Sequence, residues 1–336
     1  MSGIPTVSID DTEAICESLE RFSAVSLHAE SCVSEFIIKN CFNACSDLHS
    51  LPESVKQMYA ASRDGSLRGY YSGESVGESG SSIDRHYSSF EIGASEYGGI
   101  SRNRVKDSLA APNKWPTVPN FRSHVLAYIE CVQSVGDKIL ARLADRKLIP
   151  EKVVSAAKQD RIGLIRLIQY GDYGDAADSL SPHTDYELLS VIISDSPGLE
   201  ISSHSGEWFT VPSGPEVVTV LLGDLAEIAT GGRLESALHR VRLDQPRRSL
   251  VYFYGLDLDF SFRDLAGWQP LDYYEVETVG DHIAPFLLVN FPHLQEVCVD
   301  ASRWFPLPQH NPLKAKKILR LLPTSTSPDV GGKTVN

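Results

Sequence analysis

The sequence predicts an α+β protein whose core is mainly β-sheet. From residue 162 onward, short runs rich in β-branched residues are separated by Gly, Pro, Asp or Ser, which is the pattern of a β-sandwich or a jelly roll. Before that point, apolar residues recur at steps of three and four, which is the spacing of amphipathic helices. We therefore expect a helical N-terminal layer followed by a β core.

The N-terminal stretch is expected to hold one strand and three helices. Residues 4–10 have the composition of a short strand, and Asp11-Thr12-Glu13 opens a helix whose acidic first turn suits the helix dipole. A third helix begins near Pro52, because a proline in the first turn has no N–H to leave unpaired. Between them, a second helix is predicted over residues 29–48, with a buried side formed by Val33, Phe36, Ile37 and Ala44.

The middle of the chain contains a polar loop and then a long helix. Residues 73–82 are rich in Gly, Ser and Glu and predict a flexible loop; without a lysine and a following helix they do not form a phosphate cradle. Residues 118–147 predict a helix, with Pro119 in its first turn. Its apolar stripe consists of Phe121, Val125, Tyr128, Val132, Val135, Ile139 and Leu143.

The predicted strands of the core follow this helix at short intervals. They cover residues 162–170, 188–193, 199–202, 208–211, 217–222, 237–243 and 249–254. A further helix is expected to begin near Gly280-Asp281-His282. Residues 325–336 are rich in Ser, Thr and Gly and are expected to be frayed.

Composition excludes several classes of function. A net charge of −13 disfavours a nucleic-acid partner, which needs a basic surface. No apolar run reaches the roughly 18 residues of a membrane span, and the N-terminus lacks the basic and apolar regions of a signal peptide. The six cysteines include no Cys-x-x-Cys pair, which favours buried thiols in a reduced, cytoplasmic protein. No feature indicates an obligate protein partner.

Three side chains in the predicted β core have the chemistry of a metal site. His183 and Asp185 are two residues apart, so on an extended strand both point to one face. His239 follows after several strand-like and turn-like segments that can return it to the same place. Two imidazoles and one carboxylate leave coordination positions open, an arrangement typical of non-haem Fe(II) oxygenases.

A second pair of side chains can bind a carboxylate. Arg247 and Ser249 are also two residues apart and share a strand face, so a guanidinium and a hydroxyl can donate to one anion. Arg248 then points to the opposite face and is interpreted as a solvated charge.

Together these residues resemble the isopenicillin-N-synthase-like superfamily of Fe(II)/2-oxoglutarate-dependent dioxygenases. The resemblance covers most of the chain, and several further motifs contribute to it. They are Ile4–Asp10, Leu51-Pro52-Glu53-Ser54-Val55-Lys56, Arg68-Gly69-Tyr70-Tyr71, Phe90-Glu91, Asn113-Lys114-Trp115-Pro116, Gly223-Asp224 and Thr230-Gly231-Gly232.

The resemblance implies a fold and a division of the chain. The fold is a double-stranded β-helix (a cupin-like jelly roll) with an N-terminal helical layer and a long helix as the spine outside the barrel. The implied parts are an N-terminal, substrate-covering region over residues 1–115, the spine helix and its connection over 116–158, the jelly-roll core over 159–262, and a C-terminal helix and tail over 263–336.

The resemblance also implies roles for particular residues. His183, Asp185 and His239 would bind Fe(II), and Arg247 and Ser249 would hold the distal carboxylate of 2-oxoglutarate, with Tyr170 as a further donor. Around Tyr170 the chain departs from the family, because Gly171-Asp172-Tyr173 replaces Tyr-Pro-Pro. Candidate substrate residues are Arg68, which could anchor a substrate carboxylate, and the possible pocket residues Tyr70, Phe90, Tyr186 and Phe286.

The implied activity is the oxidation of a small molecule, with an amino-acid-derived or aromatic secondary metabolite as the expected class of substrate. O2 and 2-oxoglutarate would be consumed, with release of succinate and CO2, and the outcome would be hydroxylation, desaturation, or oxidative ring formation or expansion. Two alternatives stay open. One is an iron oxidase of the same fold that does not use 2-oxoglutarate, like isopenicillin N synthase or the ethylene-forming (ACC) oxidase of plants. The other is a non-catalytic binding module.

Overall fold

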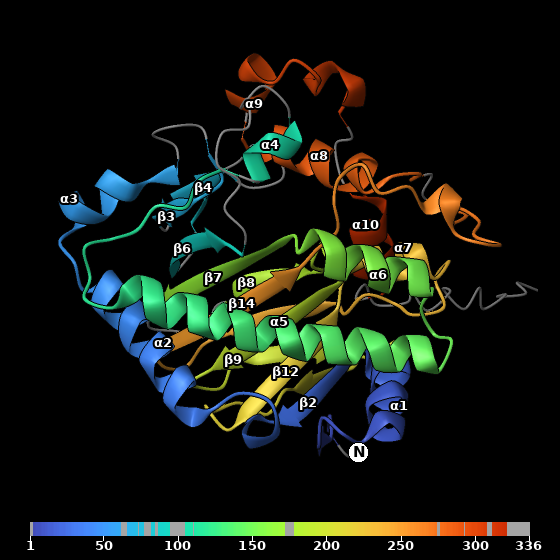
Figure 1. Cartoon of the computed structure of the whole chain (residues 1–336), viewed down its shortest axis with the longest axis horizontal. Helices are drawn as coiled ribbons and strands as arrows, with labels where there is room; N and C mark the ends of the chain where they lie inside the picture. The colour runs from blue at the N-terminus through green and yellow to red at the C-terminus, as the bar shows by residue number, and fades with distance from the viewer. Residues whose placement is uncertain are drawn as a thin grey trace, which may run out of the picture.

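Two sheets that face each other form the core of the protein (Figure 1), and their strands pair antiparallel except for the parallel pair of Thr6–Val7 with Ala24–His28. The computed structural model describes residues 3–61, 66–72, 74–76, 82–84, 87–94, 105–109, 111–171, 178–273, 276–291, 293–307 and 311–320. The larger sheet has the strand order β1 (Thr6–Val7), β2 (Ala24–His28), β12 (Val217–Leu222), β9 (Leu189–Ser194), β14 (Arg247–Tyr254), β7 (Gly163–Tyr170), β6 (Tyr87–Gly93), β3 (Gly69–Tyr71). The smaller has the order β11 (Trp208–Thr210), β10 (Leu199–Ser202), β13 (His239–Arg242), β8 (Asp178–His183).

Alternating side chains explain why the sheets pack face to face. Ile192 of β9 and Val251 of β14 belong to a buried cluster shared with Leu199 and Val241 of the smaller sheet. The intervening residues, such as Val191, face the other way and pack in a second core beneath the helices. The architecture is therefore the jelly roll that the sequence predicts.

The long predicted helix is α5 (Phe121–Asp145), and it lies across the outer face of the larger sheet (Figure 1). All seven predicted stripe residues are buried. The approach is close: a Cβ added at Gly136 would lie 2.5 Å from the ring of Tyr254, and Gln133 donates to the Tyr252 hydroxyl at 2.9 Å. The prediction of a helix along the outside of the barrel is thus confirmed.

Of the remaining helices, α2 (Glu35–His49) packs beside α5 against β7 and β14, and the others lie around the larger sheet and at one end of the sheets. These others are α1 (Thr12–Phe22), α3 (Glu53–Lys56), α4 (Val105–Leu109), α6 (Glu151–Asp160), α7 (Asp224–Ala229), α8 (Val279–Asn290), α9 (His293–Val297) and α10 (Pro312–Leu319). Asp11 caps α1, and Thr278 with Asp281 forms a capping box at the start of α8, where a helix was expected. Helices α4, α8 and α9 gather at one end of the sheets (top of Figure 1).

The N-terminal predictions needed correction. The strand expected over residues 4–10 is only two residues long, and Ala24–His28 forms β2, which pairs with β12. The second helix therefore starts later, at Glu35, and Phe36 is 71% exposed instead of buried. A buried run such as Ala24–His28 has no alternation that identifies a strand, so its partner strand decides the structure.

Several elements were not predicted. Strands β3, β6 and β8 and helix α6 were not predicted from the sequence. Strands β4 (Glu74–Val76) and β5 (Ser82–Asp84) pair with each other; β4 lies within the predicted loop of residues 73–82, and β5 begins at its last residue. The tail from residue 325 lies outside the described residues, and the division of the chain at residues 115, 158 and 262 stays a prediction. Of the helices described, none combines the length and apolarity needed to cross a membrane.

Candidate active site

The three metal-ligand candidates meet where the smaller sheet ends. His183 is the last residue of β8 and His239 the first of β13, and the two residues are direct antiparallel partners. Asp185 follows β8 after one intervening residue. Its Oδ1 lies 3.8 Å from His183 Nε2, and its Oδ2 lies 3.8 Å from His239 Nε2. One ligand atom from each residue falls within 4.8 Å of the others, a spacing that one metal ion can bridge.

Backbone carbonyls orient both imidazoles. His183 Nδ1 lies 2.8 Å from the carbonyl oxygen of Ser181, and His239 Nδ1 lies 3.0 Å from that of Ala237. Since a carbonyl oxygen only accepts, each Nδ1 carries the proton and each Nε2 presents a lone pair toward Asp185. Ser190 Oγ donates to Asp185 Oδ2 and holds that carboxylate in place.

The electrostatics give His183 and Asp185 the protonation states that a divalent cation requires. Burial and the neighbouring His239 lower the pKa of His183 to about 3. Burial raises the pKa of Asp185, but the nearby imidazoles lower it more, so its pKa falls below the ordinary value. At neutral pH the site therefore offers a neutral imidazole and an ionised carboxylate, the forms that bind Fe(II).

The carboxylate-binding candidates lie in the same pocket as these ligands, which we call the inner pocket. Its polar wall includes His183, Asp185, His239, Arg247, Ser249 and Tyr170, and its apolar wall includes Leu180, Ile192, Leu199, Val241 and Val251. Arg247 is only 2% exposed, donates from Nε to the Ser196 carbonyl at 3.1 Å and lies with its guanidinium carbon 5.1 Å from the centre of the Tyr170 ring.

Two hydroxyls continue the hydrogen bonding of Arg247, and of the two only Ser249 lines the inner pocket. Ser194 Oγ accepts from Arg247 Nη2 and lies 3.1 Å from Ser249 Oγ. Arg248 points the other way, as its position on β14 predicts, but it is paired instead of simply solvated. Its Nε donates to Asp195 Oδ2 at 2.6 Å.

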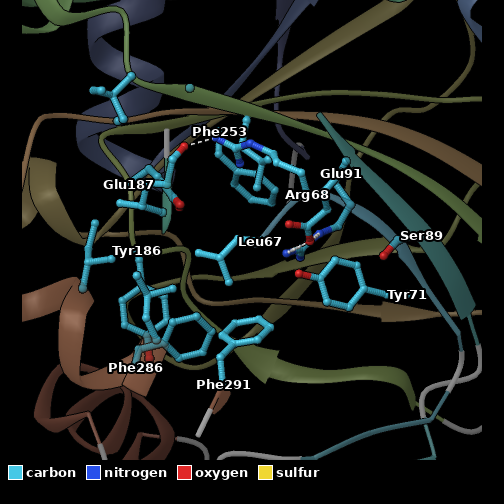
Figure 2. A pocket seen from close by; sticks show the side chains of 18 of the residues that line it. Leu67, Arg68, Tyr71, Ser89, Glu91, Tyr186, Glu187, Phe253, Phe286 and Phe291 are labelled. Carbon is cyan, nitrogen blue, oxygen red and sulfur yellow. Dashed lines mark hydrogen bonds and ion pairs between the residues drawn. The ribbon is translucent and has the colours of Figure 1, made fainter. Parts of the chain in front are cut away.

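A second, larger space adjoins the inner pocket, and we call it the adjoining cavity. Its volume is about 280 Å³, and Tyr87, Arg166 and Phe253 line both spaces. Figure 2 shows the rings of Tyr186, Phe286 and Phe291 gathered on one side of this cavity, with Arg68, Glu91 and Tyr71 on another.

The structure separates the substrate candidates into two groups. Arg68, Tyr186 and Phe286 line the adjoining cavity. Tyr70 and Phe90 do not belong to its lining: the Tyr70 hydroxyl donates to Glu53 at 3.2 Å, and Phe90 packs edge-on against Phe121. For Tyr70 and Phe90 the structure shows core packing and no contact with the cavity.

The sequence analysis missed several polar residues of the site. Arg166 donates from Nε to Glu91 Oε1 at 2.7 Å, and this ion pair lies between the two spaces. Glu187 lines the adjoining cavity directly after Tyr186; burial, followed by the charge of Asp185, raises its pKa to about 7. Arg166 could have been found, because its even spacing from Tyr170 on one strand places both side chains on one face.

His282, to which the sequence analysis gave no role, is buried. Its Nε2 lies 3.0 Å from Asp224 Oδ2, and Asp224 N donates to the Asp185 carbonyl at 2.8 Å. A Cβ added at Gly223 would lie 2.1 Å from the Glu187 carbonyl oxygen, so only glycine allows this close approach. The Gly223-Asp224 motif thus supports the backbone that carries Asp185.

The fold and the site define an oxygenase of the Fe(II)/2-oxoglutarate type, and comparisons with known proteins agree. Residues 163–256 match the family model of the 2OG-Fe(II) oxygenase superfamily. The 2-oxoglutarate-dependent dioxygenase traH of Penicillium crustosum is 27% identical over 235 residues, which cover 66% of this chain and 71% of that protein.

Two solved structures share the fold. A putative 2OG-Fe(II) oxygenase family protein of Caulobacter crescentus superposes with a TM-score of 0.72 at 21% identity, covering 85% of this chain and 99% of that one. The dioxygenase for auxin oxidation 1 of Arabidopsis thaliana, in its complex with 2-oxoglutarate, gives a TM-score of 0.59 at 22% identity and covers 75% and 92%. The family-model match, the dioxygenase relative and the set of His183, Asp185 and His239 support assignment of the chain to the Fe(II)/2-oxoglutarate oxygenase superfamily.

Proposed function

We propose that this dioxygenase hydroxylates a small organic molecule, of the kind found in secondary metabolism, in the adjoining cavity. His183, Asp185 and His239 hold the iron, and Arg247, Ser249 and Tyr170 hold the distal carboxylate of 2-oxoglutarate. The observation that carries the proposal is that a three-residue ligand set and a buried guanidinium share one inner pocket, beside a separate cavity with aromatic walls.

The residues present fit both groups. Two imidazole nitrogens and one carboxylate are a donor set suited to Fe(II), and they leave positions open for other ligands. Arg247 and the Ser194–Ser249 hydroxyls present several donors in one place, which suits a carboxylate. Iron and 2-oxoglutarate, when bound, supply the oxidising chemistry, in which one atom of O2 enters succinate, the other enters the substrate, and CO2 is released.

The protein's own residues orient the reactants and exclude water. The carbonyls of Ser181 and Ala237 fix the two imidazoles, and Ser190 fixes Asp185, so the donor atoms need no rearrangement when the metal arrives. The apolar wall of the inner pocket keeps water from the reacting atoms. Arg166 and Glu91 neutralise each other's buried charge, so neither side chain is available to bind iron or 2-oxoglutarate.

The test follows the visible charge-transfer band that forms when 2-oxoglutarate chelates Fe(II) through its keto acid. We expect the band when Fe(II) and 2-oxoglutarate are added without oxygen to the metal-free protein, and we expect its loss in His183→Ala. His204→Ala is the matched control, because His204 is 44% exposed and lies outside the inner pocket.

Two results would contradict the assignment. One is a band that survives in His183→Ala with unchanged Fe(II) affinity. The other is iron binding by the wild-type protein that gives no band with 2-oxoglutarate, which would place the co-substrate elsewhere.

A further inference from the structure

The charged groups of the adjoining cavity are unequally satisfied. Arg166 and Glu91 are paired through two close contacts, because Arg166 Nη2 also lies 2.6 Å from Glu91 Oε1. Arg68 lines the same cavity and forms no comparable ion pair with any residue that the structure describes. It directly precedes β3, and it is buried, with 3% of the residue exposed.

The contacts of Arg68 leave part of its guanidinium unused. Its Nη2 donates to the carbonyl of Leu109 at the end of α4, and its Nε has no hydrogen-bond partner among the described residues. Burial lowers the pKa of Arg68, but an arginine stays charged in proteins. Glu91 attracts it from nearby, yet that carboxylate is already bound to Arg166. A buried charge without a counter-ion is unfavourable, so an anionic ligand would stabilise this arrangement.

The backbone makes room for this guanidinium. A Cβ added at Gly93, at the end of β6, would lie 2.5 Å from Arg68 Nη2 and 2.7 Å from its Nε. Asn113 fixes the same glycine, because its Oδ1 accepts from the Gly93 N–H at 2.7 Å and its Nδ2 donates to the Gly93 carbonyl at 2.9 Å. The guanidinium of Arg68 therefore occupies the space that a side chain at position 93 would need.

Strand register places Arg68 far from the 2-oxoglutarate residues. On β7, Tyr170 pairs with Arg247, whereas Leu164 pairs with Gly93. Leu164 lies six positions before Tyr170, which corresponds to about 20 Å along a strand. Arg166 lies between them and lines both spaces, so the order along the barrel is Arg247, the metal ligands beside Arg166, and then Arg68.

We propose that Arg68 binds a carboxylate of the substrate, so that the substrate class is an organic acid with an aromatic or apolar body. The aromatic rings of Tyr186, Phe286 and Phe291 hold that body (Figure 2). The acid thus binds with its carboxylate away from the iron, and a C–H bond remote from the carboxylate is hydroxylated. The proposal rests on the proposed function of the same site.

The test compares matched probes on protein that cannot turn over. The protein is loaded with Zn(II) and 2-oxoglutarate, and binding is measured by calorimetry for ω-phenylalkanoates of increasing chain length, such as 3-phenylpropanoate, and for the corresponding primary amides. The amides have nearly the same shape without the charge. We expect the best acid to bind about tenfold to a hundredfold more tightly than its amide.

Variants connect that preference to Arg68. Arg68→Gln should abolish the preference for the acid. Gly93→Ala should weaken that preference by displacing the guanidinium of Arg68, and it keeps the test usable if Arg68→Gln folds poorly. Arg263→Gln is the control, because Arg263 is 65% exposed and pairs with Glu277 at the surface. The Fe(II)–2-oxoglutarate band should persist in all three variants; loss of the band in wild-type protein would refute the proposed function instead.

Three outcomes would overturn the proposal. They are equal binding of acids and amides, an acid preference that survives in Arg68→Gln, and no binding of any acid in the series. A separate readout tests the orientation: with Fe(II) and oxygen, mass spectrometry of a bound acid should locate the new hydroxyl toward the phenyl end. Hydroxylation next to the carboxylate would contradict the order of groups along the barrel.

Discussion

Replacing Arg247 by glutamine is the sharpest test of how this protein binds 2-oxoglutarate. The guanidinium is 2% exposed and is held by the Ser196 carbonyl and by Ser194 Oγ. A bound carboxylate would take two charge-assisted hydrogen bonds from it, each contributing about 1.5–3 kcal/mol. Glutamine keeps one neutral donor, and neighbouring contributions are not additive, so we expect a net loss of about 2–4 kcal/mol. At 1.4 kcal/mol per tenfold, 2-oxoglutarate binding should weaken by about thirtyfold to several hundredfold.

The assay is an anaerobic titration of the Fe(II)-loaded protein with 2-oxoglutarate, followed at the charge-transfer band. Arg248→Gln is the matched control, because Arg248 is the next residue on β14 but pairs with Asp195 and does not line the inner pocket. We expect that control to lose stability without losing 2-oxoglutarate affinity, and both variants to keep Fe(II) affinity. The reasoning is refuted if Arg247→Gln binds 2-oxoglutarate within about threefold of wild type, or if both variants weaken it equally.

Three further predictions concern stability, each measured by urea denaturation. Burial lowers the pKa of His49 from 6.5 to about 4, so below pH 6.5 the unfolded chain binds a proton that the folded chain does not. The free energy of unfolding should therefore fall by up to about 3 kcal/mol between pH 6.5 and pH 4. His49→Gln should remove this part of the pH dependence. Phe121→Ala should cost about 3–5 kcal/mol, because the ring is 1% exposed at the start of the α5 stripe, and a cost below about 1 kcal/mol would contradict that packing. His282→Ala should cost about 3–5 kcal/mol by leaving buried Asp224 without its imidazole partner, and adding Asp224→Ala should cost less than the sum of the two single changes.

Two of the three proposed metal ligands and the proposed carboxylate-binding pair could be predicted from the sequence because each of these pairs has a short local signature. His183 and Asp185, like Arg247 and Ser249, are separated by one residue, and that spacing places side chains together on any extended backbone. Phe121 and the rest of the α5 stripe were equally readable, since helical periodicity persists over many turns. These features are local, so the tertiary structure had only to preserve them.

The tertiary structure decided what depends on pairing between distant segments. The register of β13 with β8 places His239 directly opposite His183. Pairing with β12 makes Ala24–His28 a strand of the larger sheet, although its sequence did not identify it as a strand. The sequence identified Arg68 as a candidate but could not show that it is buried over Gly93, or that its Nε has no hydrogen-bond partner in the part of the chain that the structure describes. The physical reason is that spacing along the chain fixes only the face on which a side chain lies, whereas burial, ion pairing and cavities arise when surfaces that are remote in sequence pack against each other.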